Sequence, residues 1–109
     1  MEKIYNKLVR DNIPDIIEKD NETPYIRILS DDEFIIELKK KIIEEAQEVF
    51  SSTDEEIMGE LADVYEILNE LAIRNGKTIE DVQKLALAKK AKRGGFSKKI
   101  YLEKTMRND

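Results

Sequence analysis

The sequence contains neither cysteine nor histidine. Without cysteine there is no disulfide and no thiolate nucleophile, and without histidine there is no Ser–His or Cys–His catalytic pair. An ordinary zinc site is excluded as well, because its ligands are drawn from these two residue types. Any metal ion would therefore be bound by oxygen ligands, which favours Mg²⁺, Mn²⁺ or Ca²⁺.

Long apolar runs are also missing. No stretch approaches the roughly 18 uninterrupted apolar residues of a transmembrane helix, and the N-terminal residues 1–6 lack the apolar core of a signal peptide. Charged residues make up 39% of the 109-residue chain and hydrophobic residues 40%, which is too apolar for a disordered chain. We therefore expect a single cytoplasmic domain spanning residues 1–109, with no membrane partner and only a modest core of its own.

The net charge of −5 is unevenly distributed. Acidic residues are concentrated in the middle of the chain, whereas basic residues are concentrated between Lys84 and Arg107. The negative total argues against nonspecific binding of nucleic acid, so we expect no nucleic-acid partner. An acidic centre followed by a basic tail is suited to holding a metal ion together with a polyphosphate.

The spacing of apolar residues predicts an all-α fold. Four helices are expected: a short one from Pro14 through Glu18, and longer ones over residues 31–50, 54–74 and 79–93. Residues 25–29 are short and β-branched, which makes a strand-like or extended segment possible. The tail from Phe96 to Leu102 contains apolar residues, which are expected to dock on the body.

Signals for the ends of these helices support the prediction. Ser30 and Glu33 match a capping box, and Thr78 is suited to cap the last helix. The second long helix is expected to begin near Asp54, with the Asn75-Gly76 pair ending it, and Gly94-Gly95 stops the third. Short loops between long helices predict a helical bundle with an antiparallel hairpin.

The two central helices carry the candidate metal ligands. At about 100° per residue, Glu45 and Glu48 flank the apolar stripe of the first helix, while Glu60 and Asp63 flank the same edge of the second. Each cross-helix pair, Glu45 with Asp63 and Glu48 with Glu60, is centred on residue 54. A turn there brings the four carboxylates to one level, where a divalent cation would offset their repulsion.

A solvated charged face is the simpler alternative. Lys40 and Lys41 are placed to pair with Glu44 and Glu45 at i, i+4, although the Lys-to-Glu direction contributes only tenths of a kcal/mol. Glu44 is expected to point towards solvent, and a position without direct contact to the metal is favoured for it over the role of a metal ligand.

The chain resembles the MazG-like, all-α NTP pyrophosphatase superfamily. Glu44-Glu45-Ala46-Gln47-Glu48 and Glu60-Leu61-Ala62-Asp63, with eleven residues between them, match its acidic hallmark. Lys7-Leu8-Val9-Arg10-Asp11-Asn12-Ile13-Pro14 resembles its phosphoribosyl-ATP pyrophosphohydrolase-like branch, and Lys90-Ala91-Lys92-Arg93-Gly94-Gly95-Phe96 resembles the basic glycine motif after the third helix.

The resemblance implies Mg²⁺-dependent hydrolysis, with Mn²⁺ as a substitute, of a nucleotide to the monophosphate and pyrophosphate. By motif position, the metal ligands would be Glu45, Glu48, Glu60 and Asp63. Glu44, together with Glu45, would orient or deprotonate the attacking water. The family works as homodimers or dimer-based tetramers that share a bundle, so we expect dimerisation to complete this one.

Basic residues complete the predicted site. Charge on the transferring phosphorus and on the leaving pyrophosphate needs cations, and Lys90 and Arg93 are the first candidates, followed by Lys7 and Arg10. For the first two, the alternative is a cation-rich helix C-terminus that complements the helix dipole. For Lys7 and Arg10, it is a surface salt bridge.

Two alternative functions stay open. One is a phosphoribosyl-ATP pyrophosphatase of histidine biosynthesis, whose scaffold and carboxylates would look alike. The other is a non-catalytic helical interaction module whose acidic face binds a basic partner or is simply solvated.

Overall fold

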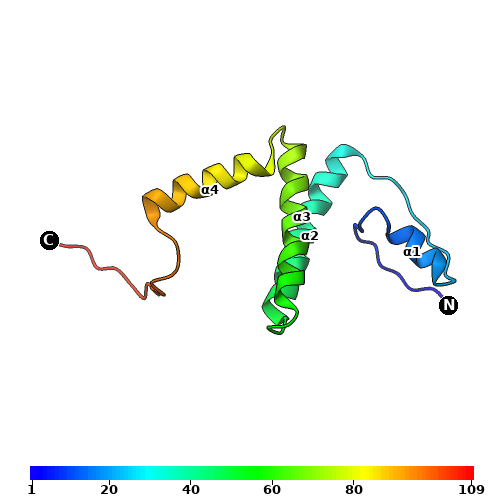
Figure 1. The fold of residues 1–109 in the computed structure, drawn as a ribbon, viewed down its shortest axis with the longest axis horizontal. Coiled ribbons are helices and arrows are strands. Elements are labelled where there is room, and N and C mark those ends of the chain that lie inside the picture. The colour runs from blue at the N-terminus through cyan, green and yellow to red at the C-terminus, as the bar shows by residue number, and fades with distance from the viewer.

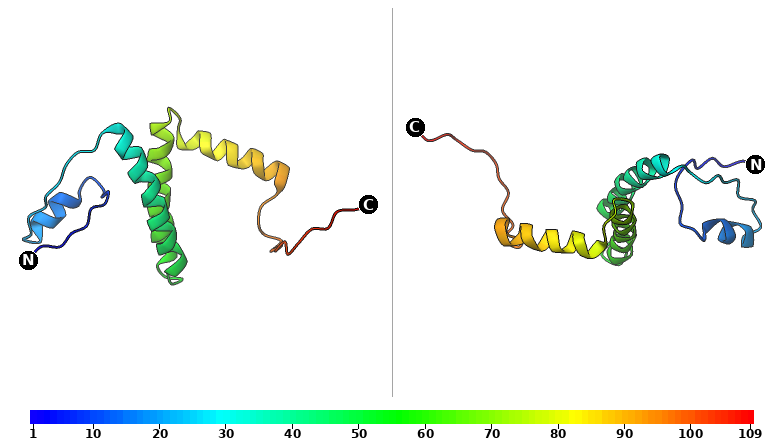
Figure 2. Two further views of the ribbon diagram at one scale, coloured as in Figure 1. Left: turned by 180° about the vertical axis from the view of Figure 1, so that it is seen from behind. Right: turned by 90° about the horizontal axis from the view of Figure 1, so that it is seen from above.

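The computed structural model describes residues 1–109 and contains four helices and no strand. They are α1 (Ile13–Lys19), α2 (Asp31–Ser51), α3 (Ile57–Arg74) and α4 (Ile79–Arg93). Helices α2 and α3 lie side by side and antiparallel (Figures 1 and 2). The predictions of an all-α fold and of a helix hairpin are therefore confirmed, and this packing is consistent with a helical bundle.

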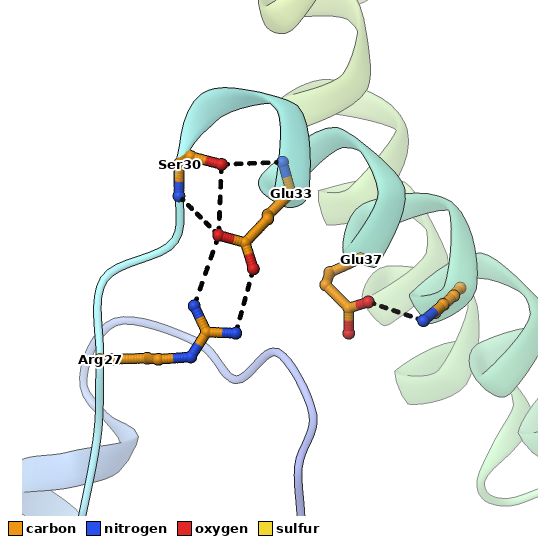
Figure 3. A network of polar contacts seen from close by, with 5 residues as sticks. Arg27, Ser30, Glu33 and Glu37 are labelled. Carbon is orange, nitrogen blue, oxygen red and sulfur yellow. Dashed lines mark hydrogen bonds and ion pairs between the residues drawn. The ribbon is translucent and has the colours of Figure 1, made fainter.

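The start of α2 is fixed by the predicted capping box. The Glu33 amide donates a 3.2 Å hydrogen bond to the Ser30 hydroxyl, and the Ser30 amide donates to the Glu33 carboxylate. Arg27 adds two hydrogen bonds of 3.0 and 3.4 Å to that carboxylate (Figure 3). The hydrogen bonds from Arg27, together with the one from the Ser30 amide, hold the pKa of Glu33 below its ordinary value. These contacts connect the extended segment before α2 to the first turn of that helix.

The start of α3 differs from the prediction. The helix begins at Ile57, and residues 54–56 form a turn instead of the expected first helical residues. The Glu56 carboxylate reaches back to accept hydrogen bonds from the amide and hydroxyl of Thr53, at 3.0 and 3.1 Å. The amides of Glu56 and Ile57 both donate to the Thr53 carbonyl at 3.0 Å, so residues 54–56 form a turn that leads into the helix, and the helix proper begins three residues later than expected.

Residues 25–29 are extended but form no strand. A strand needs a neighbouring edge with which to exchange backbone hydrogen bonds, and an all-helical chain offers none. Tyr25 and Ile28 are accordingly almost fully exposed, at 94% and 89%.

Very little of the chain is buried. Only Leu38, Ile67, Ala72 and Ile79 are buried, the first three in the α2–α3 hairpin. Helix α4 touches α3 near its start, where Ile79 is buried, and then projects away (Figures 1 and 2). The radius of gyration is 19.0 Å, against about 13 Å for a compact domain of this length. The single chain is therefore elongated, with its helices incompletely covered.

The expectation that the C-terminal tail docks on the body is wrong for the single chain. Phe96 is 99% exposed, and Ile100, Tyr101 and Leu102 are also exposed. The tail continues away from the hairpin beyond α4 (Figure 1). None of the helices combines the length and the apolar character required to cross a membrane.

Candidate metal centre

Three of the four predicted ligands meet at one point of the hairpin. Glu45 comes from α2, and Glu60 and Asp63 come from α3, one turn apart. One carboxylate oxygen from each lies within 4.8 Å of the others, and all three residues are half-buried. The loop centred near residue 54 sets the two helices at the register that this convergence requires.

The fourth predicted ligand, Glu48, lies at the rim. It is exposed and is not part of the set of converging oxygens. Its charge is nevertheless close enough to Glu60 to raise the pKa of that carboxyl. Glu48 is therefore a neighbour of the cluster in this conformation.

The cluster is electrostatically unfavourable without a cation. Burial raises the pKa of Glu45, and the nearby negative charge of Asp63 raises it further. Burial likewise raises the pKa of Glu60, followed by the charges of Glu48 and Asp63. Like charges and desolvation both oppose ionisation. A divalent cation removes both penalties by replacing lost water contacts with metal–oxygen bonds.

Glu44 does not point freely into solvent, contrary to the prediction. Its half-buried carboxylate accepts hydrogen bonds at 3.3 Å from Lys7 and at 3.3 and 3.4 Å from Lys41. Burial by itself would raise the pKa of Glu44, but the two ammonium groups outweigh it and leave the pKa lowered. Glu44 is thus held in its charged form beside the cluster.

The N-terminal segment supplies two cations to this region. Arg10 donates a 2.7 Å hydrogen bond to Asp63, and Lys7 bonds Glu44 as described. Residues separated by 53 and 37 positions are thereby brought together. Both N-terminal cations predicted from the sequence therefore lie at the acidic cluster, in the ion-pair arrangement that was their alternative reading.

The two predicted cations of α4 lie elsewhere. Lys90 and Arg93 occupy the last turn of α4, at the end that points away from the hairpin (Figure 1). Within one chain they do not approach the converging carboxylates.

Lys41 has a different partner from the one that i, i+4 spacing predicts, which is Glu45. In the structure Lys41 pairs with Glu44 at i, i+3, and Lys40 pairs with Glu37. The Lys41 side chain is only 18% exposed, and its positive charge counteracts the rise in the pKa of Glu45. The i, i+3 spacing of Lys41 and Glu44 is the sequence feature that could have predicted this ion pair.

The donor set fits a hard divalent ion. Mg²⁺ prefers oxygen ligands and keeps several waters when it binds a few carboxylates. Glu45, Glu60 and Asp63 offer only carboxylate oxygens, from two helices that hold them in place. Arg10 and Lys7 beside them can neutralise phosphate oxygens.

Comparison with known proteins gives little further information. No family model matches the chain, and no solved structure matches it. An uncharacterized protein of Mycolicibacterium smegmatis is 49% identical over 43 residues. That segment covers 39% of this chain and 44% of the relative, so the chain spans less than half of that protein's length. The family resemblance drawn from the motifs stays a prediction.

Proposed function

We propose that the protein is a Mg²⁺-dependent nucleotide pyrophosphohydrolase, which cleaves a nucleoside triphosphate or related nucleotide between the α- and β-phosphates. The observation that carries the proposal is the convergence of Glu45, Glu60 and Asp63 from two helices. Three partly buried carboxylates that meet at one point favour a bound cation over a merely solvated acidic face, because their mutual repulsion is otherwise only partly offset by Arg10 and Lys41.

The chain's own groups have distinct roles in this reaction. When bound, Mg²⁺ neutralises phosphate oxygens and lowers the pKa of a coordinated water. Arg10 and Lys7 bind phosphate oxygens as negative charge develops on the leaving group. Glu44, kept ionised by its lysine partners, orients the attacking water and accepts a hydrogen bond from it.

The active form is proposed to be a homodimer, alone or within a tetramer. On α3, Met58, Leu61, Tyr65 and Leu68 are exposed and follow heptad-like spacing. On α2, Ile36, Ile43 and Phe50 recur every seven residues and are also exposed. By helical phase, both stripes lie on the flank of the core opposite the acidic residues. This surface, called here the apolar flank, is suited to pack against the same surface of a second copy.

Pyrophosphate release from a panel of ribo- and deoxyribonucleoside triphosphates, with Mg²⁺ or with EDTA, tests the activity. We expect Mg²⁺-dependent pyrophosphate together with the matching monophosphate. Glu45→Gln and Glu60→Gln should abolish turnover while circular dichroism shows unchanged helicity. Glu66→Gln is the matched control, because Glu66 is an exposed carboxylate of α3 outside the cluster.

Other outcomes identify the alternatives. Turnover of phosphoribosyl-ATP, with none of the triphosphates, would favour the histidine-biosynthetic enzyme. No turnover of any substrate, with no rise in melting temperature on adding Mg²⁺ or Mn²⁺, would favour the interaction module, because a metal that binds the folded state must stabilise it. Full activity in both Gln variants would contradict the assigned site.

A further inference from the structure

Two extended segments near opposite ends of the chain have unpaired backbones. Residues 23–29 and residues 100–109 belong to no helix or strand, and none of their backbone groups takes part in a backbone–backbone hydrogen bond. The first segment follows α1, and the second follows the turn after α4. Amide and carbonyl groups in such segments are free to pair with another extended chain.

Residues 25–29 are already held in an extended form. Arg27 is bonded to Glu33 of α2 at 3.0 Å (Figure 3), which fixes the direction of this segment as it enters the helix. Because successive side chains of an extended chain point to opposite faces, Ile26 and Ile28 lie on the face away from this contact. They are 64% and 89% exposed. The segment thus presents an apolar face and an unpaired edge that are ordered before a partner binds.

The C-terminal tail offers a matching segment. By the same alternation, Ile100 and Leu102 share one face, and they are 81% and 73% exposed. Ile100 and Tyr101 belong to the residue types that favour strands. Cross-strand pairs of such side chains stabilise a two-stranded ladder. Each segment therefore provides the partner edge that the other lacks.

The two segments do not meet within one chain. Helix α1 and residues 25–29 lie on one side of the α2–α3 hairpin, whereas α4 and the tail extend on the other side (Figures 1 and 2). The longest dimension of the chain is 67 Å. If a two-fold axis runs perpendicular to that dimension, the C-terminal side of one copy overlies the N-terminal side of the other, and the contact occurs twice.

The charges around the two segments favour this contact between copies. Residues 11–33 contain eight acidic and two basic side chains, whereas residues 89–107 contain eight basic and one acidic. Every ion pair of the chain involves residues at or before Arg74, so the C-terminal cations have no ion-pair partner in their own chain. Opposite charges favour the pairing of a tail with an N-terminal segment over the pairing of two tails.

We propose that residues 100–103 of one copy add to residues 25–29 of a second copy as a β-strand, in two symmetric intermolecular ladders. The proposal rests on the homodimer suggested for the active form, but not on hydrolysis. It adds a second interface to that of the apolar flank. It also explains why a tail with exposed apolar side chains has no apolar contact in its own chain.

Cross-linking between chains tests this inference, and the absence of cysteine from the protein removes any background. Full-length chains carrying Ile28→Cys are mixed with chains carrying Ile100→Cys, allowed to exchange partners, and treated with a short bismaleimide. We expect a product of twice the chain mass, in which peptide mass spectrometry finds the two thiols joined. Added salt should lower its yield, because the attraction between the charged regions is screened.

Glu55→Cys, mixed with Ile100→Cys, is the matched control. Glu55 is also exposed, but it lies in the loop at the opposite end of the hairpin from residues 25–29. It should give at least about tenfold less product, since only paired residues have a high effective concentration. Equal yields would overturn the inference. A cross-link within a single chain that carries both Ile28→Cys and Ile100→Cys would also overturn it, because the tail would then dock on its own body.

Two further measurements test the ladder itself. The amides of residues 25–29 and 100–103 should exchange hydrogen at least about tenfold more slowly in the associated protein than after dilution to the monomer. Ile100→Ser with Leu102→Ser should raise the dissociation constant of the dimer about tenfold, because apolar cross-strand pairs are lost from both contacts.

Failure of this inference and failure of the proposed association are distinguishable. If light scattering shows a dimer but no cross-link forms between residues 28 and 100, the tail pairing is overturned and the apolar flank stands. If the protein is a monomer at all concentrations, both are overturned. Each result is independent of whether the protein hydrolyses nucleotides.

Discussion

At the residue scale, the contact of Arg10 is the one that would most directly affect a metal ion at the acidic cluster. Its guanidinium occupies Asp63 at 2.7 Å, so it competes with any cation for that carboxylate. Arg10→Gln removes both the competitor and a nearby positive charge. We expect Mg²⁺ to raise the melting temperature at lower concentrations in this variant, while KM for the nucleotide rises because a phosphate-binding group is lost.

The control for Arg10 is Arg27→Gln, which removes another ion pair to a carboxylate, that of Glu33, away from the cluster. It should leave the Mg²⁺ dependence of the melting temperature unchanged. If Arg10→Gln weakened metal binding instead, the competition between guanidinium and metal would be disproved.

The raised pKa of Glu45 predicts a pH effect on the metal-free protein. A carboxyl whose pKa is higher in the folded state favours folding when it is protonated. That contribution is complete below its ordinary value of 4.5, and it is lost as pH rises through the raised folded value. In EDTA, Glu45→Gln should therefore melt at a higher temperature than the unsubstituted protein at about pH 7, and the difference should vanish towards about pH 4.

Taking the difference between the two proteins removes the groups that do not interact with Glu45. Glu33, Glu56 and Asp81 have lowered pKa values, so they contribute stability above their ordinary values that is lost as pH falls through their folded values. These contributions are common to both proteins and cancel. With saturating Mg²⁺ the order should reverse, because only the unsubstituted protein keeps all three ligands. A pH-independent difference in EDTA would show that Glu45 is not destabilised by its surroundings.

At the scale of elements, two helices depend on the same capping device. The Thr78 hydroxyl accepts from the Asp81 amide at 3.2 Å, as Ser30 does from Glu33. Replacing a capping hydroxyl by alanine costs about 1 kcal/mol. Ser30→Ala should therefore lower the free energy of unfolding measured in urea by about that amount, because α2 belongs to the hairpin that contains most of the buried residues.

Thr78→Ala should act differently. Helix α4 buries only Ile79, so loss of its cap should fray α4 more than it unfolds the hairpin. We expect faster amide hydrogen exchange in the first turns of α4, with protection in α2 and α3 little changed. Uniformly faster exchange across all helices would show instead that α4 unfolds together with the hairpin.

The elements that the sequence predicted well are those defined by local chemistry. The Ser30 capping box, the Thr78 cap, the end of α3 at Arg74 and the bounds of α4 depend on residues within a few positions of each other. The start of α3 was placed three residues too early because residues 54–56 form a turn, in which the Glu56 carboxylate accepts hydrogen bonds from the amide and hydroxyl of Thr53. The extended residues 25–29 have strand-like composition, but strand formation depends on a partner that composition does not reveal.

In the candidate site, too, the residues placed by local chemistry were predictable and those placed by long-range contacts were not. Glu45, Glu60 and Asp63 meet because helical phase and a short loop determine their positions, and both are readable from the sequence. The attachment of Lys7 and Arg10 to Glu44 and Asp63 required closure of a long segment, which no periodicity encodes. Their roles were predicted only through the family resemblance.

At the scale of the whole molecule, the elongated shape and the exposed apolar flank lead to a prediction about association. We expect light scattering to give a mass of at least twice the 12.7 kDa of one chain, and a melting temperature that falls on dilution. Leu61→Glu introduces a charge into the apolar flank, where burial against a second copy would be costly. It should shift the protein to monomer and remove the concentration dependence of melting.

Ile73→Glu is the matched control, because Ile73 is as exposed as Leu61, at 45% against 44%, and belongs to the same helix. By helical phase Ile73 lies outside the apolar flank, so this variant should stay associated. If both variants became monomeric, the loss would reflect general damage to α3. If the unsubstituted protein were a monomer at all concentrations, the apolar flank would need a different partner. Separation of activity from association, with Leu61→Glu monomeric yet fully active, would place the complete catalytic site within one chain.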